Sequence, residues 1–431
     1  MTVEAVKVID DVVDHSKPIN GHSFTIGWLL NSLRENDSRY QKLHGHRSVK
    51  DITAYDVSGG KGFVSIVLRC TIKFVDSINE SDCYTTILKI PGFESFEEAN
   101  EKSDFDKDLM NDATRTKFVQ MHKFECDFYS QLSPIIEAPA PKVYKVVDWI
   151  LEKKEGCLHM EDLTLRGKTL SFFDNISLTQ VKSFIRHLAR MHKNILSLDE
   201  KIWKGKFLKN QDGFVEFIEF MTHSYEPFLK SCKRENEFRP LLEKYYKFSE
   251  SKDYYLYVNK QSHNDLGIIP VLAQGDMHPG NIMWGIDSNG DIKQELAAIV
   301  DWQTMHEGSP MEDLARFLSH CADGVVRRQA EAFAIEYYLE CLTKEFGGGS
   351  NKVPYTLEQL KKSYNLHFIT QGIFSIVVVK FFLTAMEDKI PTEALKEAYH
   401  DFGVLKAFNC LQDVDRLLKG ECKEYYEKYG L

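Results

Sequence analysis

The stretch QGDMHPGNIMWGIDSNGDIKQELAAIVDWQ, residues 274–303, decides the fold. Two apolar runs within it, 282–286 and 296–300, are expected to be strands that flank the turn DSNG at 287–290, and Asn-Gly is the strongest short signal for a β-hairpin. Asn281 precedes the first run and Asp301 follows the second, so strand pairing would bring these side chains together. Asp276 stands five residues before Asn281, which lets one loop direct both side chains to the same point. The stretch therefore predicts a hairpin whose open end gathers two Asp side chains and one Asn.

This grouping has a chemical use. Phosphoryl transfer needs one group that orients the attacking hydroxyl and oxygen ligands that hold magnesium. Asp276 suits the first role, and Asn281 and Asp301 suit the second, because hard cations prefer oxygen ligands. An Asp and an Asn five residues apart are common in ordinary turns, where they hydrogen-bond locally. The added hairpin and the closing apolar-apolar-Asp favour a catalytic core for ATP-dependent phosphoryl transfer.

Several motifs then resemble a known family. GDMHPGN followed by IVDWQ is similar to the choline-kinase and aminoglycoside-phosphotransferase superfamily. EGSPMEDLARFLSHCADG and the early GGKGFVS look like its ecdysteroid-kinase-like branch, the CHK-kinase-like proteins. The resemblance extends from about Gly59 to about Gly324. It implies a kinase-like fold that phosphorylates small-molecule hydroxyls with ATP and Mg²⁺. Gln274 departs from the family, which usually has His two residues before the catalytic Asp.

Composition sets the outer limits. The 431 residues are 43% hydrophobic and 12% aromatic, which is ample for a large core. The net charge of −10 without a long basic run argues against a nucleic-acid partner. The nine cysteines lack zinc or disulfide-framework spacing, and the N-terminus lacks a signal-peptide apolar stretch, so a cytoplasmic protein is expected. The most apolar window, 367–386, is interrupted by Gln371 and Lys380 and predicts a buried helix rather than a membrane span.

A nucleotide-binding region is predicted earlier in the chain. Residues 63–75 alternate between apolar and polar, which is typical of a strand. The glycine-rich turn before this strand could simply connect two strands, or its backbone amides could approach phosphates. The resemblance favours phosphate covering by Gly59, Gly60, Lys61 and Gly62.

Lys89 lies inside a further predicted strand, 84–90, where the simplest role of a lysine is to protect a sheet edge. The predicted helix 113–132 offers another role, because Glu125 falls on its apolar stripe. A carboxylate on a buried helix face needs a cation, since burying it alone is costly. Lys89 and Glu125 are therefore expected to form the lysine–glutamate pair that positions ATP phosphates in kinases. The alternatives are a solvated helix edge for Glu125 and Glu101 as the partner.

Strands 141–150 and 156–161 follow, and the second runs into the polar exit CLHMEDLT. In the family this segment connects the two lobes, and its backbone meets the adenine edge. The resemblance therefore implies nucleotide contacts at Met160, Glu161, Asp162 and Leu163.

The pattern becomes helical from about residue 178, where one helix face is formed by Val181, Phe184, Ile185, Leu188 and Met191. Helical segments are expected at 214–232 and 235–249, and a second helical region begins at about Pro310. Only about ten residues separate Asp301 from that second helical region. A protein kinase needs a longer segment there to dock a peptide, so a small acceptor is favoured. Asp313 would brace the catalytic loop, as the family implies, or would simply be a first-turn acid that complements the helix dipole.

The sequence thus predicts an α+β, bilobal protein-kinase-like fold. A small antiparallel-sheet N-lobe with one main helix precedes a larger, mostly helical C-lobe. The expected parts are a helical extension at 1–50 with one short helix, a nucleotide-binding lobe at 51–163 and a catalytic, acceptor-binding lobe at 164–431. The expected function is ATP- and Mg²⁺-dependent phosphorylation of a sterol-, glycoside- or choline-like acceptor. The alternatives are a weak pseudokinase that binds nucleotide or a partner, supported by Gln274, a protein kinase, and, with less support, a metal hydrolase.

Overall fold

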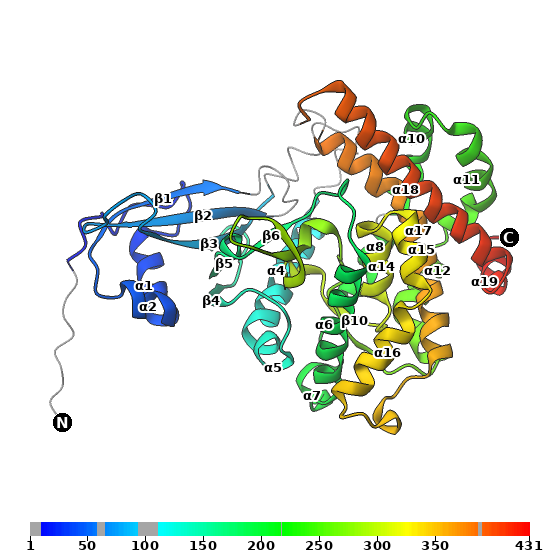
Figure 1. The fold of residues 1–431 in the computed structure, drawn as a ribbon, viewed down its shortest axis with the longest axis horizontal. Coiled ribbons are helices and arrows are strands. Elements are labelled where there is room, and N and C mark those ends of the chain that lie inside the picture. The colour runs from blue at the N-terminus through cyan, green and yellow to red at the C-terminus, as the bar shows by residue number, and fades with distance from the viewer. Residues whose placement is uncertain (1–9, 58–64, 94–110, 217, 387–389) are drawn as a thin grey trace. The chain divides into compact units, whose positions relative to one another are not determined.

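The computed structural model describes residues 10–57, 65–93, 111–216, 218–386 and 390–431. The chain packs as two units (Figure 1). Unit 1 comprises Met1–Leu132 and Pro141–Leu165, and unit 2 comprises Ser133–Ala140 and Arg166–Leu431. Each unit is described separately below.

Unit 1 is built on a five-stranded sheet in the order β1-β2-β3-β5-β4 (Figure 1). All four neighbouring pairs are antiparallel. The alternation predicted for β2 is present, because Leu68, Cys70, Ile72 and Phe74 are buried while the residues between them are partly exposed. The strands are β1 Val49–Asp56, β2 Ser65–Phe74, β3 Cys83–Pro91, β4 Val143–Val147 and β5 Cys157–Glu161.

The segment before β1 forms two helices, whereas the sequence predicted one. Helix α1 spans Ile26–Asn36 and α2 spans Ser38–His44. Asp37 separates them, since its extended backbone ends α1 and its side chain accepts hydrogen bonds from the first amides of α2. Both helices contribute to one apolar core with β1, β2 and β3.

The main helix of unit 1 follows β3 in the chain order. α4 spans Asp112–Asp127 and continues as one π-helical turn, η2, at Phe128–Leu132. The chain is therefore helical over the predicted range 113–132, but its hydrogen bonds change from the α-helical to the π-helical pattern near the end.

Unit 2 holds two small antiparallel sheets, β6-β8-β9 and β7-β10. The predicted hairpin is β8-β9, although β9 begins at Ile292, earlier than predicted. Gly290 takes a φ of +85° in its turn, and the Asp287 carboxylate accepts hydrogen bonds from the amides of Asn289 and Asp291. The strands are β6 Gly167–Thr169, β7 Val271–Ala273, β8 Ile282–Ile286, β9 Ile292–Ile299 and β10 His306–Gly308.

The remainder of unit 2 is helical. α6 begins with a capping box between Ser177 and Gln180 and buries the predicted apolar stripe of Val181, Phe184, Ile185, Leu188 and Met191. The helical segment predicted at 214–232 is divided into the short helices α8, α9 and α10. The helices are α5 Ser133–Ile136, α6 Leu178–Leu196, α7 Glu200–Trp203, α8 Gly213–Glu216, α9 Ile218–His223, α10 Tyr225–Ser231, α11 Glu235–Ser249, α12 Lys252–Leu256, α13 Ser262–Asp265, α14 Glu312–Cys321, α15 Gly324–Glu331, α16 Ala334–Glu345, α17 Leu357–Met386, α18 Glu393–Lys419 and α19 Lys423–Tyr429.

Helix α17 runs beside α18 in unit 2 (Figure 1). In the described part of the chain it is the one helix long and apolar enough to cross a membrane, over Leu357–Thr384. However, 72% of its most apolar window is buried inside the protein. That burial is what a core helix requires. The fold is α+β, with an antiparallel-sheet unit and a mostly helical unit, as predicted.

Candidate active site

The loop that carries Asp276, residues 274–281, starts directly after β7 and is called the Asp276 loop below. Gly275 turns the chain with a φ of +86°, a conformation that side chains disfavour. A Cβ at this position would lie 2.9 Å from the carbonyl oxygen of Thr304. A glycine is therefore required both for the turn and for the close approach to the neighbouring segment.

Gln274 connects the two ends of the predicted site. Its side chain is fully buried, and its Nε2 donates to the carbonyl oxygens of Val300 at 3.1 Å and Asp301 at 2.7 Å. Its Oε1 accepts a hydrogen bond from the backbone N–H of Asp276 at 2.8 Å. One amide therefore fixes the backbone on both sides of the site. A neutral glutamine has the donor and the acceptor that this position needs, so the departure from the family's His leaves the loop supported.

Asp313 braces the same loop from the first turn of α14. Its two carboxylate oxygens accept hydrogen bonds from the backbone N–H groups of Gln274 at 2.8 Å and Gly275 at 2.9 Å. Asp313 is 1% exposed, and this burial raises its pKa to about 6. The carboxylate thus satisfies two buried backbone donors, in addition to standing in the first turn of a helix.

Asn281 and Asp301 come together at the open end of the β8-β9 hairpin. The N–H of Val300 donates to the carbonyl oxygen of Asn281 at 2.9 Å, which places Asp301 one residue from that contact. The Asn281 side chain donates through Nδ2 to the Asp276 carbonyl oxygen at 3.0 Å, so its Oδ1 is directed away from Asp276. Asp301 adopts a left-handed backbone conformation, with φ 60° and ψ 67°.

These two side chains fit Mg²⁺ better than a transition metal. No cluster of three or more His, Cys, Asp or Glu side chains that could hold a metal occurs among the described residues. Mg²⁺ needs no such cage, because it is usually bound by one or two carboxylates together with substrate phosphates and water. Asn281 supplies an amide oxygen and Asp301 supplies a carboxylate, and both are oxygen donors that suit Mg²⁺.

Arg316, which belongs to none of the predicted site motifs, contacts the predicted catalytic carboxylate. Arg316 lies on α14, and its Nη2 donates to Asp276 Oδ1 at 2.5 Å. Its Nη1 donates to Gln371 Oε1 on α17 at 3.1 Å. The only sequence signal is that Arg316 follows Asp313 by three residues on one helix, a spacing that puts both on one face.

Arg316 determines the charge state of Asp276. Burial raises the pKa of Asp276, but the charges of Arg316 and His278 and hydrogen bonds from Arg316 and Asn281 outweigh burial and hold that pKa below its ordinary value. His278 Nε2 lies 3.7 Å from Asp276 Oδ2. Asp276 is therefore ionised at neutral pH and is suited to accept a hydrogen bond from an acceptor hydroxyl.

A buried ion pair between β10 and α14 supports the Asp276 loop. His306 on β10 lies 3.0 Å from Glu312 on α14, and both side chains are less than 10% exposed. Burial lowers the pKa of His306, but the negative charge of Glu312, 3.0 Å away, outweighs it and raises the pKa to about 9. Burial raises the pKa of Glu312, and His306 lowers it to about 2.

The free energy of unfolding is expected to depend on this pair in alkaline solution. The pKa of His306 is raised on folding, so its contribution is complete below an unfolded pKa of about 6.5 and disappears as the pH rises through about 9. Each pKa unit corresponds to about 1.4 kcal/mol, so the full loss amounts to about 3 kcal/mol. Urea unfolding between pH 6 and pH 9 measures it. The double variant His306→Gln/Glu312→Gln should flatten that pH dependence, and an unchanged slope would contradict the assignment.

In unit 1 the predicted lysine–glutamate pair is present. Lys89 Nζ on β3 donates to Glu125 Oε1 at 2.9 Å and to Oε2 at 2.7 Å. Lys89 is 9% exposed and Glu125 is 1% exposed, so the solvated-edge alternative for Glu125 is wrong. Gly59, Gly60, Lys61, Gly62 and the alternative partner Glu101 lie outside the described residues.

The segment expected to contact adenine is the end of β5 and the turn after it. The carbonyl of Met160 accepts a hydrogen bond from Thr86 Oγ1 at 2.8 Å, and Leu163 is buried in the 3₁₀ turn that follows. Asp162 is bound by Arg69 at 2.7 Å and by Thr164. Glu161 Oε1 accepts from the N–H of Lys142 at 2.8 Å. The acidic side chains of this segment are thus engaged within unit 1, and its role toward a nucleotide stays a prediction.

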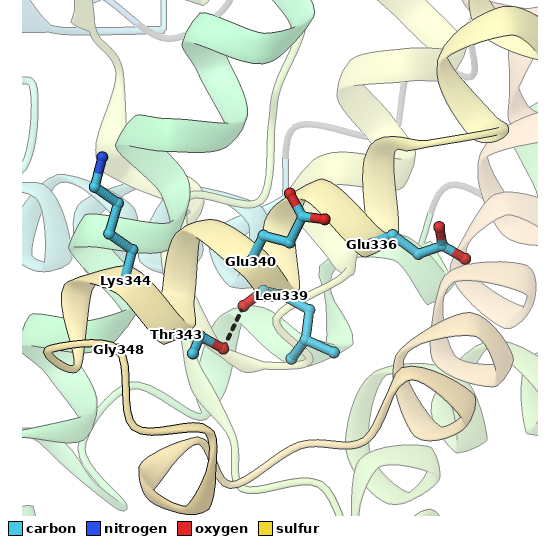
Figure 2. Close-up of a pocket in the computed structure, with 6 residues that line it drawn as sticks. All are labelled: Glu336, Leu339, Glu340, Thr343, Lys344 and Gly348. Carbon is cyan, nitrogen blue, oxygen red and sulfur yellow. Dashed lines mark hydrogen bonds between the residues drawn. The ribbon is translucent and has the colours of Figure 1, made fainter.

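A hollow of about 550 Å³ lies along α16 of unit 2, in a part of the sequence that carries none of the predicted site residues (Figure 2). One helix and the loop after it line this hollow, and Thr343 within it donates a hydrogen bond to the Leu339 carbonyl oxygen (Figure 2). None of the predicted site residues lines it. Its lining is Glu336, Leu339, Glu340, Thr343, Lys344 and Gly348.

Comparison with known proteins gives a family and distant relatives. The model of the family DUF1679, described as "Uncharacterized oxidoreductase dhs-27", matches residues 42–420. The uncharacterized oxidoreductase dhs-27 of Caenorhabditis elegans is 26% identical over 373 residues, which are 85% of this chain and 43% of that protein. The chain thus spans less than half the length of this relative. The uncharacterized kinase-like protein D1044.1 of the same organism is 24% identical over 306 residues, 70% of this chain and 75% of that protein.

Among solved structures, a choline kinase from Cryptosporidium parvum Iowa II aligns with a TM-score of 0.47 and 10% identity. The alignment covers 91% of this chain and 96% of that one. The family match and the kinase-like relative fit the superfamily that the sequence motifs resemble. Because the family model covers most of the sequence, the chain belongs to the DUF1679 family.

Proposed function

We propose that this protein is an ATP- and Mg²⁺-dependent phosphotransferase that phosphorylates a hydroxyl group of a small molecule. The observation that carries the proposal is the buried Gln274 amide. It holds the backbones of Asp276 and Asp301, while Asn281 hydrogen-bonds to Asp276. One orienting carboxylate and two oxygen donors on a fixed framework are what phosphoryl transfer needs. The nine free thiols favour a cytoplasmic location, where they stay reduced.

Each side chain of unit 2 has a separate role in this proposal. Asp276 is ionised and accepts a hydrogen bond from the acceptor hydroxyl, which turns an oxygen lone pair toward the phosphoryl group. Asn281 and Asp301 would hold Mg²⁺, which neutralises charge on the phosphate oxygens when bound. Gln274 and Asp313 keep the loop in position, so little reorganisation is needed during transfer.

Unit 1 supplies the nucleotide contacts in this proposal. Lys89, held by Glu125, presents a fixed ammonium group to the ATP phosphates. The backbone at Met160, Glu161, Asp162 and Leu163 meets the adenine edge.

The word oxidoreductase in the name of one relative leads to a different expectation. Dinucleotide-dependent dehydrogenases of the doubly wound class bind their cofactor on a parallel sheet. All seven pairs between named strands in the described part of this chain are antiparallel. Phosphoryl transfer is therefore the better account of this chain.

One observation favours the alternative of a weak pseudokinase. Arg316 occupies one oxygen of the Asp276 carboxylate, which leaves less of it for an acceptor. The second oxygen, Oδ2, has longer contacts, at 3.4 Å to Asn281 and 3.7 Å to His278. We propose that the acceptor hydroxyl approaches this second oxygen, so the ion pair orients the carboxylate without blocking it.

The proposal is tested with the purified full chain, MgATP and a pooled metabolite extract. Phosphorylated products detected by mass are expected with Mg²⁺ and not with EDTA. Asp301→Ala should lose them because it lacks a metal ligand, whereas Asp291→Ala, which changes an exposed acid in the hairpin turn, should retain them. ATP binding without product in any pool would support the pseudokinase, and no nucleotide binding would overturn both.

A further inference from the structure

We propose that Arg316 selects the acceptor by charge and that the acceptor carries no cationic group next to its reacting hydroxyl. This inference rests on the proposed function and narrows its substrate class to neutral or anionic alcohols. A choline-like or aminoglycoside-like acceptor is excluded. All the side chains involved belong to unit 2.

A cationic acceptor would need an unbalanced carboxylate beside its hydroxyl. Asp276 is the carboxylate that faces the acceptor hydroxyl in the proposed function, and Arg316 already lies 2.5 Å from its Oδ1. The Arg316 side chain is 10% exposed and is also held by Gln371, so it cannot move aside without breaking two buried hydrogen bonds. The charge of Asp276 is therefore balanced from within the protein.

Recognition of a quaternary ammonium group also needs aromatic faces. Two such faces near the site are covered by cations of the protein itself. The Arg316 guanidinium lies 5.4 Å from the Phe374 ring centre, and Lys406 Nζ lies 4.2 Å from that of Phe172. A cationic ligand would have to displace a buried cation to use either face.

The second cation, Lys406 on α18, is 2% exposed and is anchored by backbone groups. It donates to the carbonyl oxygens of His320 and Phe172 at 2.5 and 3.5 Å. Phe172 stacks on Phe382 at 4.8 Å, and Phe382 lies 5.9 Å from His278 of the Asp276 loop. A continuous row of contacts thus connects Lys406 with the loop, and its charge adds to that of Arg316.

The combined effect disfavours a positive charge on the acceptor. Two buried cations, Arg316 and Lys406, cover the rings of Phe374 and Phe172, and no carboxylate other than Asp276 contacts Arg316 among the described ion pairs. A neutral alcohol can stack on Phe382 and donate its hydroxyl to Asp276 Oδ2. An anionic group is attracted by the same two cations. The geometry therefore points to a neutral or anionic acceptor.

Calorimetric titration of the full chain with choline tests this inference, because it measures binding and needs no turnover. The wild type is expected to show no saturable binding. Arg316→Gln uncovers the Asp276 carboxylate and the Phe374 face, so it should bind choline saturably, with an affinity at least about tenfold above the weakest that the wild-type titration can detect. Arg316→Lys keeps the cation and should gain nothing. Arg190→Gln removes an arginine from an exposed pair with Glu137 and is the matched control.

Three results would overturn the inference. They are saturable choline binding by the wild type, no gain in Arg316→Gln, and a gain that persists in Arg316→Gln/Asp276→Asn. The inference is supported if Arg316→Gln gains choline affinity and the added Asp276→Asn substitution removes that gain. Failure of the proposed function is a separate result, because absence of ATP-dependent products leaves the binding measurement intact. If products do form, a phosphorylated cationic alcohol as the preferred product of the wild type would also overturn the inference.

Discussion

Asp276→Asn is expected to lower the rate of ATP-dependent phosphorylation by about a thousandfold, while the affinity for MgATP stays nearly unchanged. The amide cannot accept a proton and provides one neutral oxygen in place of an ionised carboxylate. Correct orientation of the acceptor hydroxyl is then lost at the moment of transfer. Nucleotide binding is assigned to other side chains, so it should persist.

Asparagine is the better substitution because of Arg316. In Asp276→Ala the guanidinium would lose its partner at 2.5 Å and remain buried, which would lower stability as well as activity. Asparagine keeps an oxygen for Arg316 Nη2, so the fold is retained. Initial rates with an acceptor identified from the metabolite pool, together with urea unfolding, separate the two effects. Asp291→Asn, an exposed acid of the hairpin turn, is the control. Normal turnover by Asp276→Asn would refute the role of Asp276.

The hairpin was predictable because its signals are local. The Asn-Gly turn determines where β8 ends and β9 returns, so Asp301 had to come back toward Asn281. Glu125 was predictable for a different reason: a charged residue on an apolar stripe requires a partner, and Lys89 lay inside a neighbouring strand pattern. In both cases the sequence contained the physical constraint itself.

Arg316 and His306 were not predictable in the same way. Arg316 reaches Asp276 across 40 positions of sequence, and His306 pairs with Glu312 because a three-residue strand, β10, positions it. A strand that short has no periodicity to detect, and its pairing with β7 comes from tertiary packing. The roles of Gln274 could be recognised only in the folded structure, because an amide that donates at one end and accepts at the other has no sequence signature.

Lys89→Met is expected to lower the free energy of unfolding of unit 1 by about 3–5 kcal/mol. The reason is that Glu125 is 1% exposed and would be left as a buried carboxylate without the ammonium group that now lies 2.7 Å away. Urea unfolding, monitored by a spectroscopic signal from unit 1, measures this loss of stability. Lys123→Met, two residues before Glu125 on α4, is the matched control. Its lysine is 47% exposed and pairs with Asp127, so the change should cost less than about 1 kcal/mol.

The double variant Lys89→Met/Glu125→Leu separates the structural role of the pair from its chemical one. Removing both charges eliminates the unpaired carboxylate, so stability should recover toward that of the wild type. MgATP affinity should not recover, because the ammonium group assigned to the phosphates is still missing. Calorimetric titration of both variants tests this difference. If the stable double variant bound MgATP like the wild type, Lys89 would be only a structural partner of Glu125. Weak binding by a stable protein would assign the lysine to the nucleotide.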